Sequence, residues 1–242
     1  MSSIRETPSI VRTADPAAPL LSFRNVGAAY GGRDAVLHGI DLEIGRGELV
    51  FLVGRSGAGK STILRLLTGE VRPTTGSLLL EGRDLATLAD RELPEHRRRL
   101  GIVFQDAKLL PRLTLAENVA FPLEIDGVDP VEISVEVRRS LAAVGLERLG
   151  DRYPHEVSGG ERSRASFARA IVNRPAIVLA DEPTADLDPF TAYEIAEILT
   201  LLNRTGTTLL VATHAMEIVS TLGRRVVAIE DGRIISDGPV RP

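Results

Sequence analysis

The sequence has no cysteine among its 242 residues, and it has no long apolar run. The absence of cysteine excludes disulfides, thiolate chemistry and cysteine-based metal sites, and it fits a reducing interior. No apolar stretch approaches the length of a transmembrane helix, and residues 1–20 lack the apolar core of a signal peptide. We therefore expect a cytoplasmic protein that can still dock on a membrane protein.

A strong excess of either charge is also missing. The chain carries 29 basic and 33 acidic side chains, a net charge of −4, so its overall charge does not suggest a nucleic-acid partner. Its length and its 43% apolar content predict one large α/β domain, or a core with an inserted subdomain. Residues 1–19 show three prolines, scattered charges and no periodicity, which predicts a mobile arm ahead of a domain over residues 20–242.

Hydrophobic patterning divides that domain into alternating elements. The predicted strands cover residues 20–26, 40–44, 49–53, 78–80, 102–104, 176–180 and 207–213, with a closing hairpin over 226–236. The predicted helices cover residues 61–67, 135–144, 162–172, 192–202 and 216–222. Turns are expected at Gly31-Gly32 and at 73–76. Residues 106–157 carry prolines at 111, 122 and 130, and they read as an inserted, mostly helical piece.

Residues 54–62, GRSGAGKST, match the phosphate-binding pattern G-x-x-x-x-G-K-[ST] in full. A strand candidate precedes the loop and a helix candidate follows it, as phosphate binding requires, which disfavours a glycine-rich turn that binds nothing. Lys60 is expected to reach the β- and γ-phosphates of a nucleoside triphosphate, and the Ser61 hydroxyl to bind Mg²⁺. The predicted nucleotide ligands in this loop are Gly54, Arg55, Ser56, Gly57, Ala58, Gly59, Lys60, Ser61 and Thr62.

Two carboxylates follow the apolar run 177–180. At the carboxyl end of a buried strand, Asp181 can hold Mg²⁺ through a water, and Glu182 can polarise the attacking water. Alone, this pattern is more often a strand that runs into a solvated turn. Its weight comes from the phosphate loop upstream.

Residues 157–161 read Val-Ser-Gly-Gly-Glu at the predicted start of a helix. Ser158 is a good N-terminal cap, and Gly159 and Gly160 leave backbone N–H groups bare for an anion. These five residues alone describe an ordinary capped helix.

Five features, taken in their order along the chain, resemble the nucleotide-binding domain of ATP-binding cassette (ABC) proteins. They are GRSGAGKST, Gln105, VSGGE, VLADE and His214. The resemblance covers residues 20–238. It implies a P-loop α/β core with a parallel sheet, an antiparallel β subdomain and a helical insertion. It also implies an ATPase that hydrolyses ATP to ADP and phosphate as a homodimer, with ATP sandwiched between two copies.

The resemblance assigns further roles. Tyr30 would stack on adenine, and Gln105 would contact Mg²⁺ and sense a membrane partner. His214 would contact the γ-phosphate. Ser158, Gly159 and Gly160 would grip the γ-phosphate of the ATP held by the other subunit, and Asp188 would belong to a loop that crosses the dimer interface.

Within the family, residues 91–126 and 173–188 are similar to the cell-division members. These act on the inner face of the membrane with an integral membrane protein of the FtsX type, and they turn ATP cycling into a signal for cell-wall hydrolysis. A transport ATPase with a permease, of the lipoprotein-release or macrolide-exporter type, is the alternative. A soluble switch protein is disfavoured because the chain has one cassette and no heptad array.

Four local features stand apart from the main motifs. Arg162 and Asp186 depart from the family pattern. The basic run at 96–99 reads as a solvated helix face rather than as a contact with acidic lipid or a partner. Leu109 and Leu110, in the loop 105–112, are expected to dock the membrane partner, on the strength of the resemblance.

Overall fold

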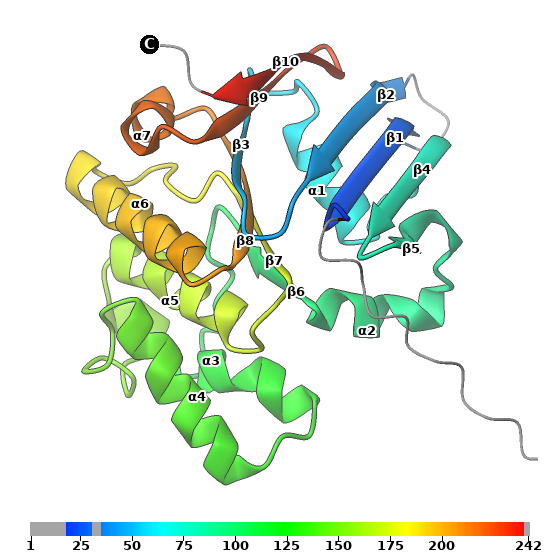
Figure 1. Ribbon diagram of the computed structural model, residues 1–242. Helices are drawn as coiled ribbons and strands as arrows, with labels where there is room; N and C mark the ends of the chain where they lie inside the picture. The colour runs from blue at the N-terminus through cyan, green and yellow to red at the C-terminus, as the bar shows by residue number, and fades with distance from the viewer. Residues whose placement is uncertain (1–17, 31–34, 240–242) are drawn as a thin grey trace, which may run out of the picture.

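The computed structural model describes residues 18–30 and 35–239. Its centre is a six-stranded sheet in the order β10-β9-β3-β8-β7-β6 (Figure 1). The strands are β3 (Leu49–Val53), β6 (Leu100–Val103), β7 (Ile177–Asp181), β8 (Thr208–Thr213), β9 (Arg225–Glu230) and β10 (Arg233–Pro239). All neighbours pair in parallel except the closing hairpin β9–β10. The predicted arm, apart from residues 18 and 19, and the turn at Gly31-Gly32 lie outside the described residues.

A second, antiparallel sheet has the order β2-β1-β4-β5. Its strands are β1 (Leu21–Ala29), β2 (Ala35–Ile44), β4 (Thr75–Leu80) and β5 (Arg83–Asp84), followed by the short turns η1 (Leu85–Thr87) and η2 (Asp90–Glu92). Helix α1 (Lys60–Leu67) shares one apolar cluster with both sheets, so it is packed between them. The cluster joins Phe23 of β1, Ile63 of α1 and Leu210 of β8.

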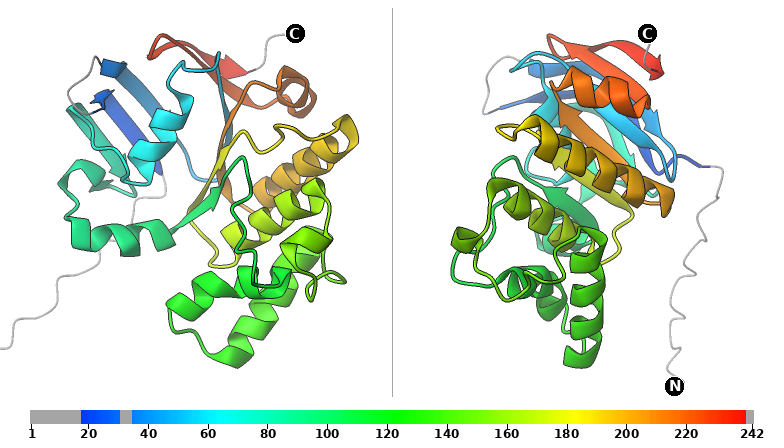
Figure 2. Two further views of the ribbon diagram at one scale, coloured as in Figure 1. Left: turned by 180° about the vertical axis from the view of Figure 1, so that it is seen from behind. Right: turned by 90° about the vertical axis from the view of Figure 1, so that its left-hand side faces the viewer.

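Helices cover the other face of the parallel sheet (Figure 2). They are α3 (Leu115–Ile125), α4 (Pro130–Ala143), α5 (Gly159–Ile171), α6 (Pro189–Arg204) and α7 (Met216–Leu222), with the turn η3 (Pro154–Glu156) before α5. Phe51 and Phe167 are fully buried in this second cluster. None of the helices in the described residues is both long and apolar enough to cross a membrane. The combination is the expected P-loop α/β core with a parallel sheet, an antiparallel β sheet and added helices.

Helix α3 lies in the stretch 106–157 that was expected to be mostly helical, but its bounds were not predicted, because Pro122 lies inside it. A proline removes one helical hydrogen bond, but here a capping box fixes the start of the helix. The Glu117 amide donates to Thr114 Oγ1 (3.2 Å), and the Thr114 amide donates to Glu117 Oε2 (2.7 Å). Burial of Val119 and Leu123 stabilises the rest.

Two other expectations need correction. Residues 73–76 are not all turn, because β4 begins at Thr75; Gly76 has φ +77°, and a Cβ there would lie 2.3 Å from the Arg24 carbonyl oxygen. The basic run at 96–99 is not simply a solvated face. It belongs mainly to helix α2 (Leu93–Arg98), and His96 is only 4% exposed.

His96 ties α2 to the end of α1. Its Nε2–H donates to the Leu67 carbonyl oxygen at 2.6 Å, and Arg97 Nε donates to the Thr68 carbonyl oxygen at 2.8 Å. Burial lowers the pKa of His96, against the hydrogen bond to Leu67, and the arginines nearby lower it further. These two contacts satisfy carbonyls that the end of a helix leaves unpaired.

The helix-covered core predicts a clear stability contrast between two phenylalanines. Phe167→Ala should lower the free energy of unfolding by about 3–5 kcal/mol, because it opens a cavity in a closed core. Phe190 is 74% exposed, so Phe190→Ala should change the free energy by less than about 0.5 kcal/mol. Urea unfolding followed by circular dichroism measures both. Equal losses in the two variants would contradict this account of the core.

Candidate nucleotide-binding site

The loop from Gly54 to Gly59 joins the carboxyl end of β3 to α1, and its shape depends on glycine. Gly57 and Gly59 have φ of +82° and +111°, values that are strongly unfavourable for residues with a side chain. A Cβ on Gly54 would lie 2.3 Å from the Ile229 carbonyl oxygen. Gly59 caps α1 without a side chain, so the first N–H groups of the helix stay open to an anion.

Lys60 folds back across this loop. Its buried Nζ donates to the Gly54 carbonyl at 2.8 Å and to the Arg55 carbonyl at 3.3 Å. The same ammonium lies 3.5 Å from Glu182 Oε1. A positive charge at the open N-terminus of α1 can bind phosphate oxygens.

Ser61 and Asp181 meet beside Lys60. The Ser61 hydroxyl donates to Asp181 Oδ1 at 3.2 Å, although the two residues are 120 apart in sequence. Burial raises the pKa of Asp181, and the Glu182 charge raises it too, while the bond from Ser61 and the charge of Lys60 act in the opposite direction. A hydroxyl and a partly desolvated carboxylate are a set of hard oxygen ligands that suits Mg²⁺.

Glu182 and His214 form the next contact. His214 donates from its backbone N–H (3.2 Å), and its Nδ1 lies 2.9 Å from the same carboxylate oxygen. Glu182 has φ +47°, and its own amide donates to the Ala212 carbonyl at 2.8 Å. The unusual backbone turns the Glu182 side chain toward both Lys60 and His214.

One cavity of about 690 Å³ gathers most of the predicted ligands. It is lined by Tyr30, Val36, Arg55, Ser56, Gly57, Gly59, Lys60, Ser61, Thr62, Arg65, Gln105, Asp181, Glu182 and His214. Tyr30 Oη lies 3.1 Å from Thr62 Oγ1, at the start of α1. Gly54 and Ala58 complete the loop behind this surface.

Arg65 was not expected in this cavity. It lies one helical turn beyond Ser61 on α1, so helical spacing was the available signal. A hydrogen bond to Tyr30 raises the pKa of Arg65, against its partial desolvation. Arg65 adds a positive charge to the lining of the cavity.

Ser158, Gly159 and Gly160 do not line this cavity. Ser158 caps α5: its Oγ accepts from the Glu161 amide at 3.2 Å, and its own amide donates to Glu161 Oε2 at 2.7 Å. A Cβ on Gly160 would lie 2.3 Å from the side chain of Thr191, so α5 and α6 need glycine there. The site on one copy is therefore assembled without these three residues.

The two departures from the family pattern have local explanations. Arg162 Nη1 donates to the Val157 carbonyl at 2.7 Å and so braces the loop before Ser158. Asp186 has φ +60°, a backbone shape that Asp tolerates better than most residues.

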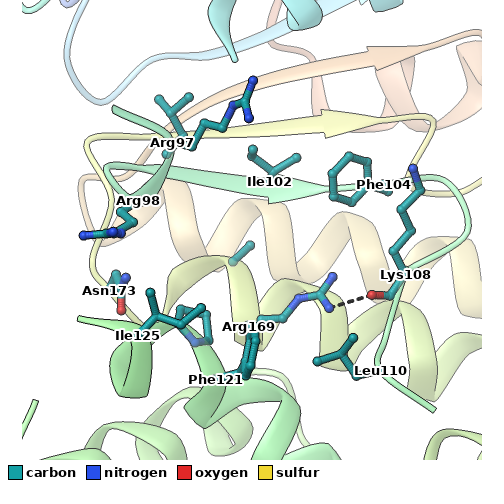
Figure 3. Close-up of a pocket in the computed structure, with 13 residues that line it drawn as sticks. Arg97, Arg98, Ile102, Phe104, Lys108, Leu110, Phe121, Ile125, Arg169 and Asn173 are labelled. Atoms are coloured by element: carbon teal, nitrogen blue, oxygen red, sulfur yellow. Dashed lines mark hydrogen bonds between the residues drawn. The ribbon is translucent and has the colours of Figure 1, made fainter. Parts of the chain in front are cut away.

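A separate groove of about 350 Å³ lies between α2 and β6 on one side and α3 and α5 on the other (Figure 3). We call it the α2–α3 groove. Its apolar lining includes Phe104, Leu110, Phe121 and Ile125, and its charged lining consists of Arg97, Arg98, Lys108 and Arg169. Of the two leucines that were expected to dock a membrane partner, only Leu110 lines the groove, and it is 39% exposed. Leu109 instead packs against the helix-side core.

Comparison with known proteins now gives the family. Residues 37–185 match the model of the protein family described as ABC transporter. The chain belongs to the ABC transporter ATP-binding family. It is an ATP-binding cassette and an ATPase.

Two relatives and one solved structure show how far the similarity extends. The cell division ATP-binding protein FtsE of Bacillus subtilis is 47% identical over 90% of this chain and 96% of its own length. The methionine import ATP-binding protein MetN of Bradyrhizobium diazoefficiens is 42% identical over 88% of this chain, but over 62% of its own length. A dimeric ATP-binding cassette, solved in a post-hydrolysis state with ADP and Pi, has a TM-score of 0.81 at 33% identity, covering 92% of this chain and 99% of that one.

The buried ammonium of Lys60 gives a direct test of the site. Lys60→Ala should weaken ATP binding at least about 100-fold, because the phosphates lose a desolvated counter-charge. Calorimetric titration with ATP measures the change. The chain has one other lysine, Lys108, which does not line the cavity, so Lys108→Ala is the matched control and should keep the parent affinity. Unchanged affinity in Lys60→Ala would remove the loop from the site.

Proposed function

We propose that this chain is the ATP-hydrolysing subunit of a membrane complex of the FtsEX type, which signals to cell-wall hydrolysis during cell division. The observation that carries the proposal is the degree of similarity to FtsE. FtsE of Bacillus subtilis is 47% identical to this chain, and the identity to MetN of Bradyrhizobium diazoefficiens is lower, at 42%.

At the proposed site, Tyr30 stacks on adenine, and the loop 54–62 holds the phosphates. Ser61 and Gln105 would hold Mg²⁺, and Asp181 would hold it through a water. Their hydroxyl, amide and carboxylate oxygens are the ligand types that Mg²⁺ prefers. The 3.2 Å contact between Ser61 and Asp181 supports this role, because it brings a hydroxyl and a carboxylate together at the start of α1.

Glu182 is the proposed group that orients the attacking water, and His214 is the proposed contact to the γ-phosphate. In the structure described here, Glu182 is held by Lys60 and His214. When phosphates attract Lys60, Glu182 loses one partner and becomes available to a water. Its second oxygen stays fixed by His214, which keeps the carboxylate aimed at the site.

A second copy of the chain supplies Ser158, Gly159 and Gly160 in this proposal. Their position outside the cavity of the same copy supports it, because the γ-phosphate then reaches them only across a dimer interface. The open N-terminus of α5 provides amide donors for the phosphate. The dimeric cassette with ADP and Pi supports a dimer of such domains.

An integral membrane partner, FtsX-like or a permease, docks in the α2–α3 groove on the cytoplasmic face. The groove offers an apolar floor between four cationic side chains. An amphipathic segment with apolar residues and carboxylates matches that surface. Gln105 follows β6, whose residue Ile102 lines the same groove, so docking lies one short loop from the nucleotide.

An ATPase subunit of an ABC transporter is the second candidate, and the 42% identity to MetN favours it. Co-purification of the chain from membranes separates the two. A single protein with few membrane spans and one large outer domain supports the division complex. A permease that carries a solute supports transport.

Glu182→Gln should still bind ATP but hydrolyse it at least about 100-fold more slowly, because the amide keeps the size and loses the basicity. The variant should then accumulate as an ATP-bound dimer. Gel filtration with Mg-ATP and a phosphate-release assay measure both effects. Glu217→Gln, on the exposed face of α7, is the control and should behave as the parent. Parent-like turnover in Glu182→Gln would contradict the role of Glu182.

Leu110→Asp should reduce binding to the membrane partner at least about tenfold, because it places a carboxylate on the apolar floor of the groove. ATP affinity should stay within about twofold, since Leu110 does not line the nucleotide cavity. A pull-down with the co-purified partner, run beside an ATP titration, measures both. Val131→Asp, on the exposed face of α4, is the control. Full partner binding by Leu110→Asp would place the docking surface elsewhere.

A further inference from the structure

The loop after Gln105 has an unfavourable backbone. Ala107 and Lys108 have φ of +59° and +45°, and neither is a glycine. Side chains other than glycine, asparagine and aspartate rarely adopt this shape unless the surroundings impose it. Two short-range bonds within the loop, Ala107 N–H to the Phe104 carbonyl (3.0 Å) and Lys108 N–H to the Asp106 carbonyl (2.6 Å), follow the turn but do not anchor it to the rest of the fold.

Arg169 supplies that anchor. Its Nη1 donates to the Lys108 carbonyl at 2.7 Å (Figure 3), and its Nη2 donates to the Ala107 carbonyl at 2.8 Å. The planar guanidinium thus holds both residues that have the unfavourable backbone. Desolvation lowers the pKa of Arg169, and within residues 18–30 and 35–239 it has no carboxylate partner at ion-pair distance. The charge is therefore directed at the two carbonyls.

Arg169 stands near the end of α5, whose first turn follows Ser158. Eleven residues separate Ser158 from Arg169, a rise of about 16 Å along one helix. The buried side chains of Ala165, Phe167 and Ala168 pack that helix into the core. One rigid element therefore carries the Ser158–Gly160 turn at one end and the contact to the Gln105 loop at the other.

A second anchor lies on the same side of the molecule. Fully buried Asn118 of α3 accepts from the Leu110 amide at 2.7 Å and donates to the carbonyls of Leu110 and Leu113 at 3.1 Å. The loop is thus fixed to the helices on its far side, while Gln105 lines the nucleotide cavity.

The geometry points to Arg169 as a positioning residue that holds the Gln105 loop in its left-handed backbone and links the position of Gln105 to that of the Ser158–Gly160 turn. A movement of Gln105 at the nucleotide displaces two carbonyls that are bonded to α5, and α5 carries the turn that meets the second nucleotide. The inference rests on the proposed roles of Gln105 and Ser158. Arg169 does not line the nucleotide cavity and acts only through the loop.

The test replaces the guanidinium by an apolar side chain of similar length. Arg169→Met should lower the kcat of ATP hydrolysis about tenfold, the effect of losing charge-assisted hydrogen bonds that position a reacting group. The Kd for ATP should stay within about twofold, because the 54–62 loop is untouched. Arg174→Met removes an exposed arginine just beyond α5 and is the matched control, with parent kcat.

A rescue experiment separates positioning from general stability. In the Arg169→Met background, Lys108→Gly removes the penalty of the left-handed backbone and should recover kcat at least about threefold. Lys108→Gln loses the same charge and the contact with the Phe104 ring but keeps the penalty, so it should recover nothing. Equal effects of the two Lys108 variants would overturn the inference, as would parent kcat in Arg169→Met.

Hydrogen exchange keeps the inference distinct from the proposed function. The amides of residues 106–109 should exchange faster in Arg169→Met, while those of α1 keep their protection. If Gln105→Ala retains full kcat, the proposed role of Gln105 fails, and faster loop exchange in Arg169→Met still supports the anchor. Unchanged exchange in the loop would overturn the anchor itself.

Discussion

Parallel pairing of the central strands is the constraint on which the site depends. Val53 of β3 lies opposite Thr213 of β8, and Asp181 of β7 lies opposite Ala212. The carboxyl ends of neighbouring strands therefore meet at one edge of the sheet, where α/β proteins bind their ligands. Four segments leave that edge: the loop at Gly54, the loop at Gln105, the turn at Glu182 and the turn at His214.

Charge at this edge is balanced internally. Lys60 is buried, yet two backbone carbonyls and Glu182 satisfy its ammonium. Glu182 is shared with His214. In the proposed function, a ligand with phosphates competes with Glu182 for Lys60, because phosphates carry more charge than one carboxylate. Lys60 and Glu182 then exchange partners.

The groove, the Gln105 loop and α5 form a second connected region. Arg97 lines the groove and also donates to the end of α1, while Arg169 lines the groove and holds the loop. Arg97 thus ties the groove to the C-terminal end of α1, and Arg169 ties it to the Gln105 loop, whose Gln105 lines the nucleotide cavity. A molecule seated in the groove would touch α5, which begins with the Ser158 turn, and the loop that follows Gln105. Such shared elements are the physical basis on which coupling between two sites has to rest.

The sequence by itself determined the parts of this protein whose chemistry is contiguous. Nine consecutive residues, 54–62, specify the phosphate loop because the required backbone shape comes from glycines within the same nine residues. Asp181, Glu182 and His214 likewise follow apolar strands in the sequence, and this pattern predicts that they lie at the site. The capping box of Thr114 and Glu117 can also be read from the sequence, although Pro122 interrupts the helical pattern that follows it.

Only the tertiary structure decided the contacts between distant segments. His96 is a buried partner of Leu67, 29 residues away, although a run of basic residues predicts an exposed face. Leu110 rather than Leu109 faces the groove, because the loop is fixed by Asn118 and Arg169 from two different helices. Arg169 bonds a loop 61 residues earlier in the chain. Local pattern does not encode such pairs, because which side chain is buried depends on the faces that α2, α3 and α5 present once they pack against the sheet.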